Sequence, residues 1–139
     1  MSNIIYNIQQ LPDDMINVIK EYLPLHIQVF LNKKSYLLYH FCLKKNIYHY
    51  ENYIRETIRR DSYFVFNEII KENCKLWLKN RNFTYKNIIY KNYIYFALSY
   101  CTENNSHVCR KMLSDFLKEH GLCQNQHKKN IIKHIRWKN

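Results

Sequence analysis

The chain has 139 residues, of which 47% are hydrophobic and 16% aromatic, and its formal net charge is +11. This wealth of large apolar side chains excludes a disordered chain, and a single glycine excludes the glycine-rich loops that cradle phosphates. Because only one glycine and two prolines are available for tight turns, we expect an all-α fold rather than an all-β or Rossmann-type one. The length fits one domain, so we predict a single-domain bundle of six or seven helices over residues 1–139.

The first helix is predicted directly after Leu11-Pro12, because proline is preorganised for a first helical turn and two aspartates follow it. Apolar residues then recur at helical spacing until Pro24 ends the helix. Asn32 is placed to cap a further helix over about residues 33–45.

Five further helices are expected in the rest of the chain. One begins near Tyr48, and the next is capped by Asp61 or Ser62 and runs to about Leu78. The strongest 3.6-residue periodicity covers residues 84–100, and it predicts a buried helix that is apolar nearly all round. Asn105 or Ser106 is expected to cap a helix over residues 107–119, and Gly121 sits where a left-handed C-terminal cap belongs. A last short helix is predicted over about residues 130–137.

Residues 9–45 resemble the F-box motif, a three-helix module, through Leu11-Pro12, the spaced isoleucines, Tyr22-Leu23-Pro24 and the later basic and aromatic segment Asn32–Tyr36. In that family the first helix packs on a Skp-type adaptor of cullin ubiquitin ligases. The resemblance therefore implies an F-box-like segment over 9–45, followed by a helical bundle with a basic C-terminal end over 46–139. It implies a partner surface formed by Leu11, Pro12, Ile16, Ile19, Leu23 and Pro24.

Three further segments are similar to uncharacterised small proteins of the nucleocytoplasmic large DNA viruses, which begin with an F-box-like segment. They are Asp61–Phe66, Tyr100–Asn104 and Asn125–Asn130 together with the final Ile135-Arg136-Trp137. The resemblance implies a viral protein. Asn, Ile, Lys and Tyr, whose codons can be written in A and T alone, account for 63 of the 139 residues, as an AT-rich genome would give.

Positive charge increases toward the C-terminus. Residues 1–35 contain three basic and three acidic side chains, whereas residues 83–139 contain ten basic and three acidic ones. On the last predicted helix a cationic row stands beside an indole, which suits a phosphate backbone. The members of this alternative nucleic-acid site are Lys128, Lys129, Lys133, Arg136 and Trp137. An anionic membrane surface, an acidic protein and a plain solvated face remain open interpretations.

The sequence predicts neither a metal site nor an enzyme. Cysteines and histidines gather at Cys101, His107, Cys109, His120, Cys123 and His127, but their spacing lacks the close ligand pairs of zinc knuckles. No nucleophile motif surrounds any cysteine. We therefore expect no cofactor, and a non-catalytic protein-interaction module that recruits a host or viral protein, conceivably to a ubiquitin ligase. The alternative is a nucleic-acid-associated or virion structural protein.

The location is predicted from the cysteines and the chain start. Five cysteines are an odd number, which favours reduced thiols and therefore the host cytoplasm, the nucleus or a virion interior. The first residues lack the basic and long apolar regions of a signal peptide, so we expect a protein that is not secreted. No run of 18 apolar residues predicts a membrane span.

The prediction that the chain folds without a metal ion can be tested. The helical far-ultraviolet circular dichroism spectrum should be the same with and without a strong chelator. Loss of helicity on chelation would instead place zinc among Cys101, Cys109, Cys123 and the nearby histidines.

Overall fold

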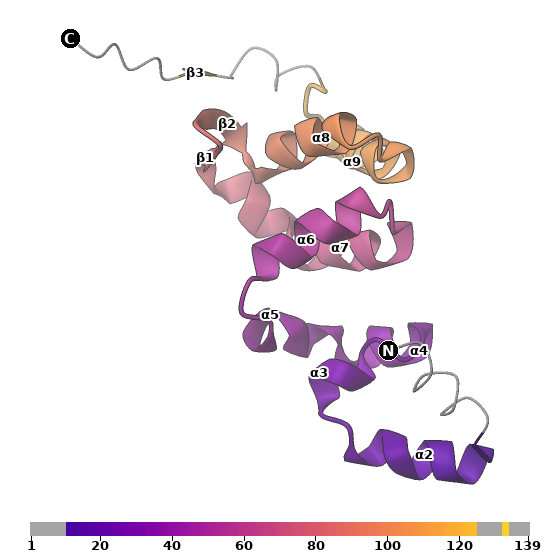
Figure 1. Ribbon diagram of the computed structural model, residues 1–139. Coiled ribbons are helices and arrows are strands. Elements are labelled where there is room, and N and C mark those ends of the chain that lie inside the picture. The colour runs from indigo at the N-terminus through magenta and orange to yellow at the C-terminus, as the bar shows by residue number, and fades with distance from the viewer. Residues whose placement is uncertain (1–10, 125–131, 134–139) are drawn as a thin grey trace. The chain divides into compact units, whose positions relative to one another are not determined.

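A computed structural model describes residues 11–124 and the backbone of residues 132–133 (Figure 1). The chain divides into two compact units, residues 1–50 (unit 1) and residues 51–139 (unit 2). Both are mostly helical, as predicted, but unit 2 also contains a small antiparallel sheet. The all-α prediction is therefore correct for the bulk of the described chain and wrong for that sheet.

Unit 1 contains a chain of short helices. They are α2 (Asp13–Tyr22), α3 (Leu25–Gln28), α4 (Lys33–Tyr39), the 3-10 turn η1 (His40–Cys42) and α5 (Leu43–Asn46). Pro12 precedes α2 and α2 ends before Pro24, as the proline positions predict, whereas the helix α3 that begins after Pro24 was not predicted. Asn32 caps α4, because its side-chain oxygen accepts the Ser35 N–H at 2.8 Å. The helix predicted over 33–45 is thus three consecutive pieces.

Unit 2 consists of two helix pairs joined through a β-hairpin. The first pair is α6 (Tyr50–Arg59) and α7 (Tyr63–Lys79), and the second is α8 (Tyr93–Glu103) and α9 (His107–Glu119). The strands β1 (Arg81–Tyr85) and β2 (Ile88–Asn92) lie between the pairs. The strand β3 (Ile132–Lys133) pairs antiparallel with β2, so the order in the sheet is β1-β2-β3. Ile132 and Lys133 therefore form a strand, where the sequence predicted a helix.

The helix predicted over residues 84–100 is the second correction. Its first half is the hairpin, and only its second half belongs to the helix α8. Lys86 and Asn87 both adopt positive φ, 48° and 63°, which is the backbone of a two-residue type I′ turn. Asparagine tolerates this conformation and so supplies what glycine otherwise would. The composition did not predict the hairpin because only glycine and proline were weighed as residues for tight turns.

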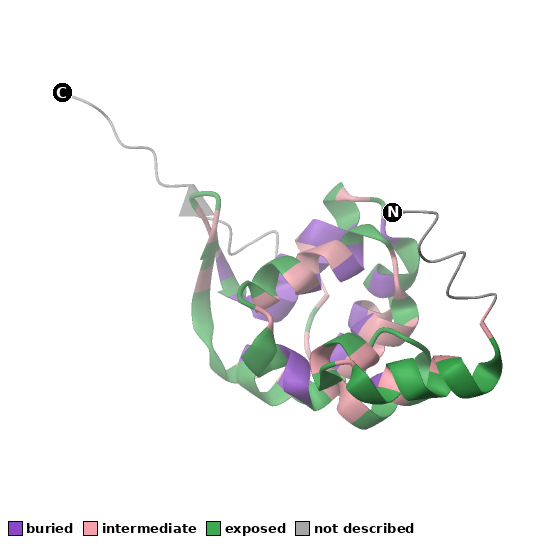
Figure 2. Cartoon of the chain, turned by 60° about the horizontal axis from the view of Figure 1, so that its bottom comes forward, coloured by how far each residue is buried: buried purple, intermediate pink, exposed green. Residues whose placement is uncertain are grey.

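Aromatic side chains fill the space between the hairpin and α8. Phe83 lies 4.8 Å from Phe96 between ring centroids, and Tyr85 lies at the same distance from Phe96. Trp77 of α7 stacks on Tyr93 at 4.5 Å. Eight of the eleven residues of α8 are buried, so the prediction of a central apolar helix is confirmed for α8 (Figure 2). Aromatic pairs at these separations add to the stability gained from burial alone.

The turns that end α6, α8 and α9 share one backbone design. Each places a residue with positive φ one position after the helix cap, namely Asp61 (49°), Asn105 (56°) and Gly121 (64°). In each, the next residue donates its N–H back to a carbonyl of the last helical turn, as Leu122 does to Leu117 at 2.8 Å. This is the Schellman motif, and it confirms the predicted role of Gly121.

Asp61 does more than end α6. Its carboxylate accepts the backbone N–H groups of Val108 and Cys109, at 3.0 and 2.8 Å, and so caps the first turn of α9. Ser106, the residue before α9, donates its hydroxyl to the carbonyl of Ile58 at 2.6 Å instead of capping its own helix. The sequence predicted that Asp61 or Ser62 caps α7 and that Asn105 or Ser106 caps α9. Neither prediction holds, because Asp61 caps α9, Ser106 bonds a carbonyl of α6, and Ser62 makes no side-chain cap bond. The three bonds of Asp61 and Ser106 join the two helix pairs.

The pKa of Asp61 reports this cap. Burial by itself would raise the pKa of the carboxyl, but the two backbone donors outweigh it and the net shift is below the ordinary value of 3.8. A carboxyl with a lowered folded pKa stabilises the fold above its unfolded pKa. That contribution is lost as the pH falls through the folded pKa.

Asp61→Ala should therefore lower the free energy of unfolding by about 2 kcal/mol, from the lost cap and from alanine at positive φ. Asn105→Ala is the matched control, since it places alanine in the same backbone geometry without removing a long-range cap. Urea unfolding should show the larger loss for Asp61→Ala at pH 7, with the difference shrinking below pH 4. Equal losses of unfolding free energy in the two variants would show that the Asp61 cap does not stabilise the fold.

Candidate protein-docking surface

The helix α2 presents an apolar face that its own unit does not cover. Met15, Val18, Ile19 and Tyr22 stand at i, i+3, i+4 and i+7, so they share one side of the helix. Their exposed fractions are 52, 53, 37 and 85%, and no residue of α2 is fully buried (Figure 2). We call these four residues the α2 stripe.

The structure divides the predicted partner surface into two groups. Leu11, Ile16 and Leu23 are half-buried, whereas Pro12, Ile19 and Pro24 are exposed. Only Ile19 of the predicted set belongs to the α2 stripe. The sequence reasoning did not select Met15, Val18 and Tyr22, although all are apolar and share the spacing of Ile19. A signal was present, since a ten-residue helix with apolar residues on two sides can bury only one of them in a small unit.

The shortage of core in unit 1 explains why so much apolar surface remains. Among its described residues only Val29, Tyr36, Cys42 and Leu43 are buried hydrophobic residues. Beyond the α2 stripe, its exposed large hydrophobic residues are Leu25, Ile27, Phe30, Leu31, Leu37, Leu38, Phe41 and Tyr48. Exposed apolar side chains in such number mark an interaction surface rather than ordinary scatter.

The α2 stripe has a shallow hollow and an acidic neighbourhood. Met15, Val18 and Ile19, together with Asp14, line a hollow of about 240 Å³. Asp13 and Asp14 occupy the first turn of α2, where carboxylates also favour the helix dipole. The site therefore offers an apolar contact area with carboxylates at one end. This suits a partner that brings apolar side chains and a nearby cation.

The alternative nucleic-acid residues fall mostly outside the described part of the chain. Lys128, Lys129, Arg136 and Trp137 lie there, and so does His127. Lys133 is described by its backbone alone, which pairs with Ile88 of β2. The structure thus brings the chain at Lys133 beside the hairpin.

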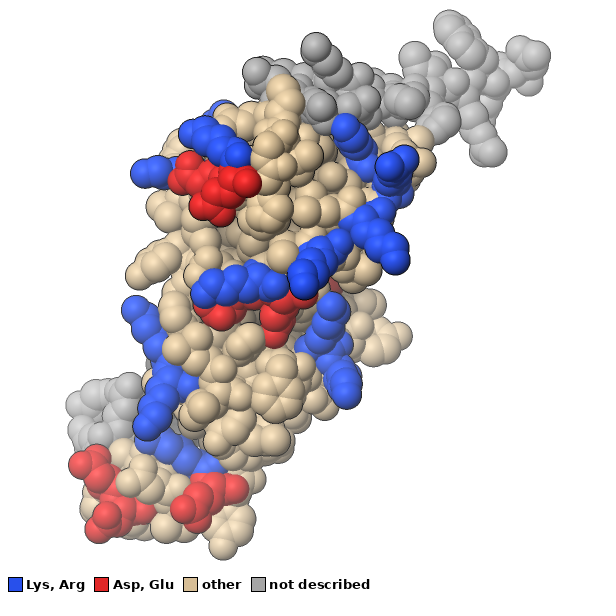
Figure 3. Space-filling model, turned by 180° about the vertical axis from the view of Figure 1, so that it is seen from behind, with Lys and Arg blue, Asp and Glu red and all other residues tan. Residues whose placement is uncertain are grey.

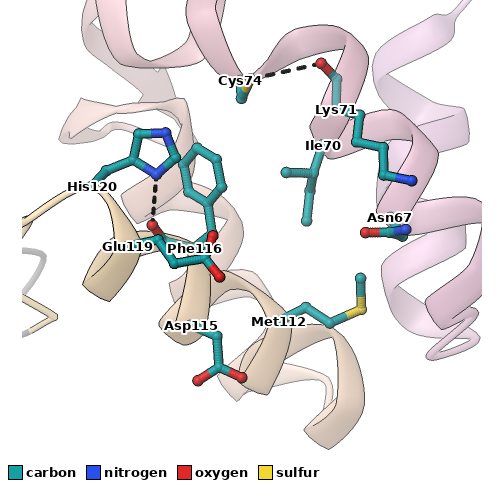
Figure 4. Close-up of a pocket in the computed structure, with 9 residues that line it drawn as sticks. All are labelled: Asn67, Ile70, Lys71, Cys74, Met112, Asp115, Phe116, Glu119 and His120. Atoms are coloured by element: carbon teal, nitrogen blue, oxygen red, sulfur yellow. Dashed lines mark hydrogen bonds between the residues drawn. The ribbon is translucent and has the colours of Figure 1, made fainter.

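The second recess of interest is a groove of about 510 Å³ between α7 and α9 (Figure 4). Ile70, Met112 and Phe116 give it an apolar lining, and Cys74 and His120 stand at one end. The thiol of Cys74 lies 3.6 Å from the carbonyl of Lys71, and His120 Nδ1 lies 2.9 Å from the carbonyl of Phe116. Both side chains therefore bond their own helices, and the groove shows no nucleophile held against a base.

The cysteines are free thiols in unlike surroundings. Cys42, Cys101 and Cys109 are buried, Cys74 is half-exposed and Cys123 is exposed. Burial raises the pKa of Cys101 to about 12, and it also raises the pKa of Cys109. No group of three or more His, Cys, Asp or Glu in residues 11–124 is arranged to hold a metal ion.

Comparison with known proteins adds no relative. The chain matches no family model, and neither a curated protein nor a solved structure is significantly similar to it. Among the helices of residues 11–124, none combines the length and the apolar character needed to cross a membrane.

The thiol environments predict an order of reactivity. Because the thiolate is the reacting species, iodoacetamide at pH 8 should modify Cys123 first and Cys74 more slowly. Cys101 and Cys109 should react only when the protein unfolds. Peptide mass spectrometry would measure the rates. Modification of Cys109 as fast as Cys123 would show that the turn between α8 and α9 opens in the native protein.

Proposed function

We propose that the protein is a non-catalytic interaction module that binds a protein partner through the α2 stripe of unit 1. The observation that supports this most is the exposure of all four members of the α2 stripe in a unit whose described core has only four hydrophobic residues. Aligned anchors at i, i+3, i+4 and i+7 are the usual pattern by which one helix face docks on a partner.

The α2 stripe can supply part of the free energy that specific binding requires. Fully burying a large apolar side chain contributes about 1.5–3 kcal/mol, so each half-exposed member keeps roughly half of that for a partner. Tyr22 is the most exposed of the four, at 85%. It also carries a hydroxyl, and tyrosines of this kind are frequent hot spots in interfaces.

The chemistry of a partner follows from the F-box resemblance of residues 9–45. We propose a Skp-type adaptor of cullin ubiquitin ligases, so that the protein would act as a viral adaptor that recruits a host protein to the ligase. The features that support it are the proline-started helix α2, the proline turn at Pro24 and the apolar face between them. Leu11, Ile16 and Leu23, being half-buried, would set the position of α2 as well as contribute contacts.

Tyr22→Ala should weaken binding of a purified Skp-type adaptor at least about tenfold in a calorimetric titration, because a central aromatic anchor is removed. Tyr48→Ala is the matched control, since Tyr48 is 92% exposed in the same unit but lies outside α2. Both variants should keep the wild-type unfolding midpoint. Equal binding by the two variants would exclude the α2 stripe, and absence of wild-type binding would exclude this class of adaptor.

A further inference from the structure

Besides the groove between α7 and α9, unit 2 contains another recess, whose lining residues have the chemistry of an anion site. It measures about 620 Å³ and is lined by Leu78, Arg81, Lys91, Asn92, His120 and Leu122. Two of these residues carry positive charge, a third is a histidine, and none is acidic. A concave site with cations on its walls and no carboxylate among them concentrates anions.

These residues come from α7, β1, β2 and the turn after α9, and backbone hydrogen bonds hold the hairpin and that turn in place. Arg81 begins β1 and is paired in register with Asn92 at the end of β2, so the hairpin base holds Arg81 opposite Asn92, one residue along the strand from Lys91. The side chain of Asn92 caps α8 by accepting the N–H groups of Ile94 and Tyr95, at 3.0 and 3.2 Å. These two hydrogen bonds to α8 anchor the base of the hairpin, so this wall of the recess has little freedom to move.

The opposite wall is set by the turn after α9. Gly121, at φ 64°, reverses the chain so that Leu122 returns to bond Leu117. The His120 ring lies tilted against Phe116 with 4.0 Å between ring centroids, and its Nδ1 is hydrogen-bonded to the Phe116 carbonyl. The carbonyl of Phe116 bonds Nδ1 of the ring and not Nε2. The imidazole is thus held in place at the rim of the recess before any ligand arrives.

Cations continue beyond the recess on the same unit. Lys75 and Lys79 are exposed on the last turns of α7, just before Arg81, and Lys86 stands at the hairpin tip. Residues 51–139 contain 17 Lys and Arg against eight Asp and Glu. Figure 3 shows many Lys and Arg side chains on the surface seen from behind, some of them beside acidic side chains. A ligand that repeats a negative charge can therefore contact more than one of them.

We propose that this recess binds the phosphate backbone of a single-stranded nucleic acid. Arg81 and Lys91 would neutralise phosphates, and Leu78 and Leu122 would contact the sugar. Because Nδ1 of His120 donates to the carbonyl of Phe116, His120 would donate a hydrogen bond from Nε2 to a phosphate only when its ring carries both protons. A flexible single strand can bend into a recess, whereas a duplex is stiff over about 50 nm. No Phe, Tyr or Trp lines the recess, and phosphate contacts carry no base information, so the binding is expected to be independent of sequence. The proposal does not depend on the partner of unit 1.

The test uses the full-length protein and a fluorescent 12-nucleotide oligonucleotide of mixed sequence, titrated by anisotropy at several salt concentrations. The variant Arg81→Gln/Lys91→Gln should bind roughly tenfold more weakly, with the slope of log affinity against log salt reduced by about 1.4, as expected for two lost phosphate contacts on a single strand. The matched control is Arg110→Gln/Lys111→Gln, which removes the same charge from exposed positions of α9. It should lose less than about threefold.

Each other outcome overturns a stated part of the proposal. Equal losses in the two double variants would show that net charge, and not the recess, governs binding. Tighter binding of duplex than of single strand would contradict the choice of a flexible ligand. If a phosphopeptide bound more tightly than the oligonucleotide and depended on Arg81 and Lys91, the recess would be a phosphoprotein site. Circular dichroism of both variants confirms that the fold is kept.

Discussion

The carboxylate of Asp61 is the interaction on which the arrangement of unit 2 depends most. It ends α6 in a left-handed conformation and at the same time accepts two amides of α9, so one side chain fixes the start of a helix 47 and 48 residues away in the chain. Because the start of α9 is fixed, the positions of Phe116 and His120 near its far end are fixed as well. Both residues line the groove beside α7, and His120 also lines the anion recess. The geometry of both recesses therefore rests on a bond made at the other end of that helix.

The two units differ in how many of their apolar residues they bury. Unit 2 places its aromatic rings inside, between the hairpin, α7 and α8, and keeps its cations on the surface. Unit 1 buries few hydrophobic residues among those described and leaves the α2 stripe open to solvent. An apolar face selects a protein, and a cationic recess selects an anion. The two proposals therefore assign a different kind of ligand to each unit.

Local signals in the sequence were sufficient for the helices whose ends carry specific side chains. The proline start of α2, the Asn32 cap of α4, the bounds of α9 and the turn at Gly121 all depend on a few neighbouring residues. The hairpin was missed because Tyr85 and Ile88 are three residues apart, which fits a helix, although they face each other across a turn that Lys86 and Asn87 supply without glycine. The Asp61 cap and the recess around Arg81 could not be predicted, since each joins residues that are distant in the chain.

The most direct test of the central claim, that α2 docks a protein, is methyl spectroscopy of the full chain with and without a Skp-type adaptor. With the methyl groups of methionine, valine and isoleucine labelled, the signals of Met15, Val18 and Ile19 should shift or broaden as the adaptor is added. Val108, which is similarly exposed but lies on α9, should stay unchanged. Shifts confined to unit 2, or none in α2 at saturating adaptor, would contradict the account.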